Sequence, residues 1–261
     1  MKSLSAAEAL LQSLGVETPD DIDLQAIAYH LGVIDITTRR LDGCEARIVG
    51  MGSHAIISVN VASIPQRRRF SVCHELGHWQ MHRGQTLYCK ATDIADRDVS
   101  QVKEREANRF AADLLLPPYL LRPMMDDRHI LSLRKVDEIR SVFKASRSAS
   151  AIQMISLHAV PALLAFTSTI GRCWSIGGPR VPRSLKTRPD IGSESYAFEI
   201  LHNSAPDQPN PRQIRADVWF NRRGSDRFRV TEQSFAVSDN TVATLISFTD
   251  PQMLEIYKDG W

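Results

Sequence analysis

The segment His74-Glu75-Leu76-Gly77-His78 constrains the fold of this chain of 261 residues more than any other feature. On an α-helix, residues four positions apart lie about 40° apart around the axis and about 6 Å apart along it. The imidazoles of His74 and His78 can therefore converge on one metal ion. Glu75 lies beside that face, where its carboxylate reaches a water at the ion instead of the ion itself. The bare pattern also fits two histidines flanking a glutamate in an ordinary salt bridge. The neighbouring sequence is therefore needed to choose between a metal site and a salt bridge.

The surroundings predict a strand before the motif and a second helix after it. The β-branched stretch 55–60 is typical of a strand. The motif itself falls in a helix expected over about residues 70–82. A second helix is expected over about 99–116, and Pro117-Pro118 ends it because proline cannot continue a helix. Acidic side chains on this second helix can complete a metal site.

A catalytic zinc ion takes three protein ligands and keeps a fourth position for water. The candidates for the third ligand are Glu104 and Glu106, which lie about 200° apart on a helix, so at most one of them faces the ion. Glu106 stands beside Ala107 and four residues before Phe110, at the margin of the predicted buried stripe. We therefore predict Glu106 as the third ligand, with Glu104 as the alternative.

His82 repeats the spacing of the two motif histidines. It lies eight residues beyond His74, about 12 Å along the helix axis. Three side chains in line on one straight helix cannot surround one ion. We expect His82 to be a packing or hydrogen-bonding residue.

Composition narrows the class of protein. The 32 basic and 30 acidic side chains give a net charge of +2, too small to predict nucleic acid or an anionic membrane as partner. No segment is long and apolar enough to span a membrane, and the first residues do not resemble a secretion signal. The cysteines, Cys44, Cys73, Cys89 and Cys173, show no CxxC spacing. We therefore expect a cytoplasmic protein without disulfides and without a membrane partner.

The chain divides into three predicted parts. Residues 1–125 combine helical spacing with two strand-like stretches, at 33–38 and 55–60, and form a compact α+β unit. Residues 126–160 resemble two short helices joined by a turn, as in a helix-turn-helix. Residues 161–261 hold eight of the 13 prolines and alternating segments, and predict a separate α+β domain with a hairpin turn at Asn240.

Taken together, these segments resemble the ImmA/IrrE family of metallopeptidases over about residues 5–125. The matching segments follow one another in the family's order: Asp23-Leu24-Gln25-Ala26-Ile27-Ala28 with Leu31-Gly32-Val33, Ile57-Ser58-Val59-Asn60, Arg69-Phe70-Ser71-Val72-Cys73-His74-Glu75-Leu76-Gly77-His78, and Glu106-Ala107-Asn108-Arg109-Phe110-Ala111-Ala112 with Leu114-Leu115-Leu116-Pro117.

The resemblance implies a zincin-like peptidase unit, built of a small sheet and the active-site helices, with one zinc ion per chain. His74, His78 and Glu106 would be its ligands, and Glu75 the catalytic base. In peptidases of this architecture an edge strand pairs with the extended substrate. The stretch 55–60 is either that strand or an ordinary core strand.

The resemblance also implies a substrate class. Family members cleave helix-turn-helix repressors and so release genes for stress response or mobile-element excision. By analogy, the C-terminal domain would regulate the peptidase or act as a sensor. The alternative function is a DNA-binding transcriptional regulator whose peptidase fold is vestigial, with residues 126–160 on DNA. We expect that segment to pack on the protein instead, because Ser148-Ala149-Ser150-Ala151 offers few side chains that read bases.

Overall fold

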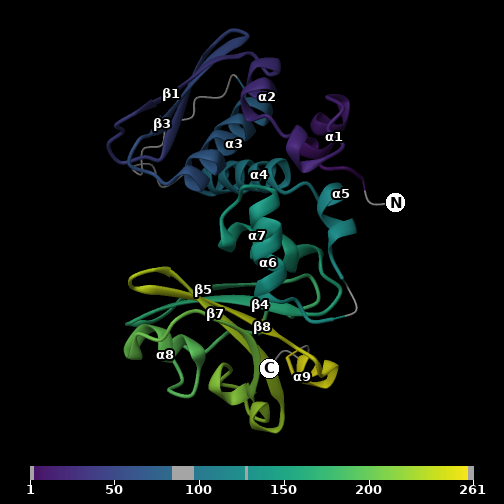
Figure 1. Cartoon of the computed structure of the whole chain (residues 1–261), viewed down its shortest axis with the longest axis vertical. Coiled ribbons are helices and arrows are strands. Elements are labelled where there is room, and N and C mark those ends of the chain that lie inside the picture. The colour runs from purple at the N-terminus through teal and green to yellow at the C-terminus, as the bar shows by residue number, and fades with distance from the viewer. Residues whose placement is uncertain (1–2, 84–96, 127–128, 258–261) are drawn as a thin grey trace. The chain divides into compact units, whose positions relative to one another are not determined.

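The computed structural model describes residues 3–83, 97–126 and 129–257. The chain forms two compact units. The N-terminal unit comprises Met1–Leu121 and Val142–Ser146, and the C-terminal unit comprises Arg122–Ser141 and Arg147–Trp261 (Figure 1). No helix in the described ranges has the length and apolar character that a membrane span requires. Both units mix helices with a sheet, as the sequence predicted for a chain of the α+β class.

The N-terminal unit contains most of the elements that the sequence predicted. In chain order they are α1 (Ala6–Ser13), η1 (Pro19–Asp21), α2 (Leu24–His30), β1 (Val33–Arg39), β2 (Ala46–Met51), β3 (His54–Asn60), α3 (Pro65–Met81), α4 (Arg97–Leu115) and α5 (Pro118–Leu121). The helix that carries the histidine motif begins at Pro65, earlier than the expected residue 70, because proline fits the first position of a helix. Strand β2 was not predicted.

The small sheet of this unit has the strand order β1-β3-β2. Strand β3 pairs parallel with β1 and antiparallel with β2, so the stretch 55–60 is a central strand. Its side chains Ala55, Ile57 and Val59 are buried, and α3 packs against β2 and β3. Strand β2 is therefore the edge strand that lies beside the motif helix.

Helices α3 and α4 pack at very short range. A Cβ atom on Gly77 would lie 3.0 Å from Cα of Ala107 and 3.2 Å from Cβ of Phe110. On the α4 side, Ala107, Phe110 and Ala111 form the buried stripe that the sequence predicted. This crossing sets which face of α4 meets the motif.

The C-terminal unit is built on a second, antiparallel sheet with the strand order β5-β4-β8-β7-β6. The predicted hairpin turn at Asn240 is confirmed, since it joins β7 to β8. The elements in chain order are η3 (Arg122–Met124), α6 (Leu133–Val142), α7 (Arg147–Leu157), β4 (Ala162–Ser168), β5 (Gly171–Gly177), α8 (Tyr196–Asn203), β6 (Gln208–Arg215), η4 (Ala216–Val218), η5 (Ser225–Arg227), β7 (Arg229–Ser238), β8 (Thr241–Ser247) and α9 (Pro251–Glu255).

Helices cover this sheet on both sides (Figure 1). Ala197 of α8 and Met253 of α9 join the buried cluster formed by sheet residues such as Ile246. Helix α7 packs against β4 and β5. The buried side chain of Gln233 on β7 accepts a hydrogen bond from Leu133 N at 2.9 Å and so ties the start of α6 to the sheet.

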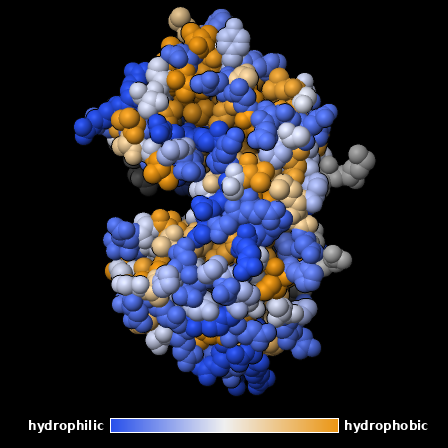
Figure 2. All heavy atoms as spheres, viewed as in Figure 1, coloured by the Kyte–Doolittle hydropathy of each residue, from blue (hydrophilic) through white to orange (hydrophobic). Residues whose placement is uncertain are grey.

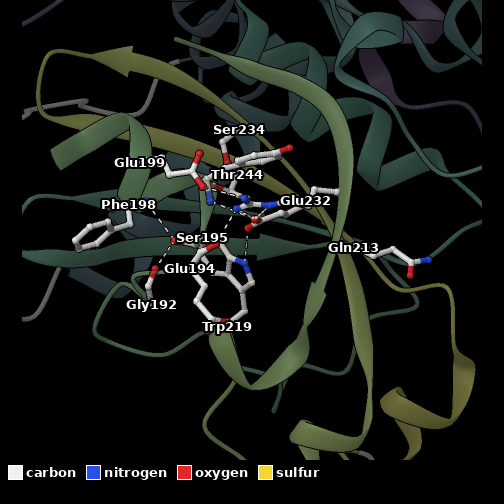
Figure 3. A network of polar contacts seen from close by, with 12 residues as sticks. Gly192, Glu194, Ser195, Phe198, Glu199, Gln213, Trp219, Glu232, Ser234 and Thr244 are labelled. Atoms are coloured by element: carbon white, nitrogen blue, oxygen red, sulfur yellow. Dashed lines mark hydrogen bonds and ion pairs between the residues drawn. The ribbon is translucent and has the colours of Figure 1, made fainter. Parts of the chain in front are cut away.

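A buried carboxylate links four elements of the C-terminal unit (Figure 3). Glu232 on β7 has no exposed surface. It accepts hydrogen bonds from Nη2 of Arg212 on β6 at 2.6 Å, from Nε1 of Trp219 at 2.8 Å and from the backbone N–H of Tyr196 at 3.1 Å. Nη1 of Arg212 also donates to Glu199 of α8 at 2.8 Å. Each oxygen of Glu232 therefore has a partner, as a buried charge requires.

Replacing Arg212 with methionine should destabilise the C-terminal unit by about 3–5 kcal/mol, because it leaves the Glu232 carboxylate buried and without its cation. Urea unfolding of the full chain measures this loss. Lys135→Ala, which breaks the solvated pair with Glu138, is the control and should cost less than about 1 kcal/mol. If both variants lose the same free energy of unfolding, the buried pair contributes no more to stability than the solvated one.

Candidate metal centre

The two motif histidines lie side by side on α3. The distance between His74 Nε2 and His78 Nε2 is 3.0 Å. His78 is buried, with 6% of its surface exposed, and His74 is half-buried. The helical spacing that the sequence predicted thus brings two ring nitrogens to one point.

Glu104 of α4 completes this cluster. Its Oε2 lies 3.3 Å from His74 Nε2, and its Oε1 lies 3.3 Å from His78 Nε2. One ligand atom from each of the three residues lies within 4.8 Å of the other two. The three side chains form a group of metal-ligand type among the described residues.

Glu106, the predicted third ligand, does not join this group, whereas Glu104, the alternative, does. The Oε2 atom of Glu106 lies 3.0 Å from His82 Nε2 instead. The reason is the rotation of α4. Ala107 faces Gly77 of α3, and Glu104, three residues earlier on α4, lies on nearly the same face. Glu106 is turned about 100° from Ala107 and reaches past the motif.

The other ring nitrogens of the two histidines also have partners. His74 Nδ1 lies 3.1 Å from the amide oxygen of Asn108, four residues after Glu104 on α4. His78 Nδ1 lies 3.1 Å from His82 Nδ1. The prediction that His82 is a packing or hydrogen-bonding residue is confirmed, since it is buried and bonded on both ring nitrogens. Asn108 was missed, although its spacing from Glu104 could have indicated it.

Glu75 lies next to this group and contacts the small sheet. Burial, and after it the negative charge of Glu104, raises the pKa of Glu75 to about 7, while a hydrogen bond from the backbone N–H of Ile48 on β2 acts in the opposite direction. A carboxylate with such a pKa can accept and return a proton near neutral pH. The contact with Ile48 places β2 directly beside the motif.

The same burial affects the histidines. It lowers the pKa of His74, and it lowers the pKa of His78 to about 4, helped by the neighbouring His74, His82 and Lys103. Metal ligation needs neutral imidazoles, so these shifts favour the binding form. The adjacent Cys73 is fully buried, and desolvation raises the pKa of its thiol to about 12, as in an inert core cysteine. Cys89 and the side chain of Cys173 lie outside the described residues.

The donor set fits a zinc ion. Two imidazole nitrogens and one carboxylate oxygen are the ligands of many catalytic zinc sites, and three protein ligands leave one coordination position open. His74, His78 and Glu104 supply this set, and hydrogen bonds to Asn108 and His82 orient the two rings, as is usual for metal-bound histidines.

Comparisons with known proteins agree with this class of site. Residues 31–154 match the family model of the IrrE N-terminal-like domain, Peptidase M78. This match supports the resemblance to the ImmA/IrrE family of metallopeptidases that the sequence predicted. A solved structure described as a Mycobacterium tuberculosis transcriptional regulator aligns with a TM-score of 0.56 and 15% identity, over 98% of this chain and 79% of that one. At this identity the likeness concerns the fold alone. No curated protein matches the chain.

Gly77→Ala should weaken both the fold and zinc binding. At an exposed helical position this change gains about 1 kcal/mol. Here the new methyl group would lie 3.0 Å from Cα of Ala107, so α3 and α4 must separate, at a cost of about 1–3 kcal/mol. Urea unfolding and zinc titration measure the two effects. A variant that is more stable and binds zinc as the wild type does would contradict the tight crossing.

Glu104→Ala should abolish stoichiometric zinc binding, because it removes one of three ligands. Glu106→Ala, two residues away on the same helix, should still retain about one ion per chain after the same zinc loading, because Glu106 contacts His82 and lies outside the group of three. Elemental analysis of the desalted proteins gives the zinc content. Loss in Glu106→Ala with retention in Glu104→Ala would restore the ligand set predicted from the sequence.

Proposed function

We propose that this protein is a zinc-dependent endopeptidase. The observation that carries the proposal is the convergence of His74, His78 and Glu104 beside Glu75. The family match supports a metallopeptidase of this kind. A site made only to bind a metal for stability has no need of a carboxylate that lies next to its ligands without being one of them.

Glu75 would act as the general base and then as the general acid. His74, His78 and Glu104 would hold the zinc ion, which would supply an acidic water and polarise a peptide carbonyl. Glu75 takes the proton of the attacking water on its carboxylate and passes it to the departing amine. The Ile48 N–H keeps the carboxylate in place during this exchange.

Strand β2 is the surface that would hold the substrate. Asn60 N–H donates to Glu45 O, so the hydrogen-bonded pairs with β3 fall at residues 45, 47, 49 and 51. The backbone groups of Ala46, Ile48 and Gly50 therefore face away from β3, and the Ile48 N–H meets Glu75. An extended peptide added at this edge would pass beside the catalytic base.

The side chains of β2 support an apolar contact with such a peptide. Val49 and Met51 are 64% and 87% exposed. Figure 2 shows apolar residues on the visible face of the N-terminal unit. Helix α3 fixes the position of the strand, because the Trp79 ring packs against Gly50: a Cβ atom there would lie 2.2 Å from the ring. The ring is itself held in place, since Trp79 Nε1 donates to Leu31 O at 2.8 Å.

The proposed substrate is a cytoplasmic helix-turn-helix repressor, and cleavage would derepress stress-response or mobile-element genes. The support is the resemblance to the ImmA/IrrE family, whose members cleave repressors of this kind. A narrow substrate also suits a single exposed edge strand beside the base, because the peptide has to leave its own fold to pair with it.

The alternative function is a DNA-binding transcriptional regulator with a vestigial peptidase fold. It would use α6 and α7 as a helix-turn-helix, whose second helix enters the major groove. No residue of α7 is exposed, and five of its residues are buried: Ser150, Ala151, Gln153, Met154 and Ile155. This burial favours a structural role for α7.

Glu75→Gln should abolish proteolysis while zinc remains bound, with a loss of at least about 10²-fold in rate. New protein N-termini can be mapped in cells that express the wild type or the variant, with Glu138→Gln, an exposed glutamate of the C-terminal unit, as control. The proposal expects a small set of cleavages, in helix-turn-helix proteins, that require Glu75. If cells with the wild type, Glu75→Gln or Glu138→Gln show identical protein N-termini and the same changes in gene expression, the DNA-binding alternative is favoured.

A further inference from the structure

His82 and Glu106 lie beside the proposed metal site without being part of its ligand group. His82 ends α3, where its backbone N–H donates to His78 O. Its ring is 5% exposed and lies between His78 and Glu106. His74, His78, His82 and Glu106 form one continuous row of contacts.

The contact between His78 and His82 joins two nitrogens of the same type, Nδ1 to Nδ1 at 3.1 Å. Such a contact is a hydrogen bond only if one nitrogen carries a proton and the other presents a lone pair. A neutral imidazole has one nitrogen of each kind. The direction of this bond therefore decides which nitrogen of His78 is free to bind a metal ion.

Glu106 sets the direction. Its Oε2 lies 3.0 Å from His82 Nε2, and an ionised carboxylate can only accept. His82 Nε2 therefore carries the proton, and a neutral His82 presents a lone pair at Nδ1. His78 Nδ1 must then donate to it, which leaves His78 Nε2 bare and turned toward His74 and Glu104.

We propose that His82 and Glu106 are positioning residues that hold His78 in the tautomer with the proton on Nδ1, so that Nε2 is presented to the metal ion. This inference rests on the proposed zinc site. The other motif histidine has a simpler support, because His74 Nδ1 donates directly to the Asn108 amide oxygen at 3.1 Å. Partners of this kind typically contribute 10–100-fold to metal affinity (about 1–3 kcal/mol).

The two positioning residues should contribute unequally to zinc affinity. His82 is buried and touches His78 directly, whereas the side chain of Glu106 is 54% exposed and acts through His82. Solvent screens an exposed carboxylate, and water can replace it as an acceptor. Removal of His82 should therefore weaken zinc binding more than removal of Glu106.

The test is the zinc dissociation constant of the full chain, measured by competition with a chromophoric chelator. His82→Phe keeps a ring in the cavity but removes the acceptor, and should weaken binding about 10–100-fold. His82→Gln supplies an amide oxygen that can accept from His78 Nδ1, and should restore most of the loss. Glu106→Ala should give a smaller loss than His82→Phe. Urea unfolding of the metal-free proteins reports whether each variant folds.

Matched controls separate positioning from general damage. His30→Phe removes an exposed histidine at the end of α2, and Arg105→Ala removes the exposed neighbour of Glu106; both should bind zinc as the wild type does. Equal affinity of wild type and His82→Phe, or equal losses in His82→Phe and His82→Gln, would overturn the positioning role and leave the zinc site intact. A wild type that binds no zinc would overturn the proposed function and this inference together. If His82→Phe does not fold, the comparison of Glu106→Ala with Arg105→Ala decides, and equal affinities there overturn the role.

Discussion

The close packing of α3 on α4 at Gly77 and Ala107 determines the geometry of the whole candidate metal centre. The two histidines of the motif come from one helix, but their third partner comes from the other, so the distance and rotation between the helices decide which side chain arrives. With no side chain at Gly77, the backbone of α4 comes close enough for Ala107 to lie against α3. Glu104 and Asn108, which are four residues apart on α4, then flank His74, and Glu106 reaches His82. This one helix crossing thus positions both the candidate third ligand and the residues that hydrogen-bond to the histidine rings.

The small sheet adds the remaining part of the site. Trp79 of α3 lies under Gly50 of β2, so the edge strand rests directly on the helix that carries the motif. As a consequence the Ile48 N–H reaches Glu75, and the edge along which a peptide would be added runs beside the proposed base. Burial of the same region lowers the pKa of both histidines, which favours their neutral forms, and raises the pKa of Glu75 to about 7. The packing of the site, the pKa values of its side chains and the position of the edge proposed to bind a peptide therefore depend on the same contacts.

Much of this arrangement could be predicted from sequence, because it depends on local periodicity. Helix α3, helix α4 with its buried stripe, strands β1 and β3, and the convergence of His74 with His78 follow from spacing within one element. The choice between Glu104 and Glu106 could not, since both lie near the margin of the stripe and only the rotation of α4 against α3 separates them. Strand β2 was missed because most of its residues are exposed and it contains Gly50, so it lacks the apolar pattern of a core strand. Strand β2 is held by its pairing with β3 and by packing on Trp79, and both partners lie outside its own segment of the sequence.

The most direct test of the account is a crystal structure of the zinc-loaded chain, with anomalous diffraction recorded at the zinc absorption edge to locate the ion. We expect one strong peak per chain, about 2 Å from Nε2 of His74, Nε2 of His78 and one carboxylate oxygen of Glu104, with one position open to solvent. The ring of His82 should lie beyond this peak, between His78 and Glu106. A peak bound by Glu106, or a peak remote from the two motif histidines, would contradict the account.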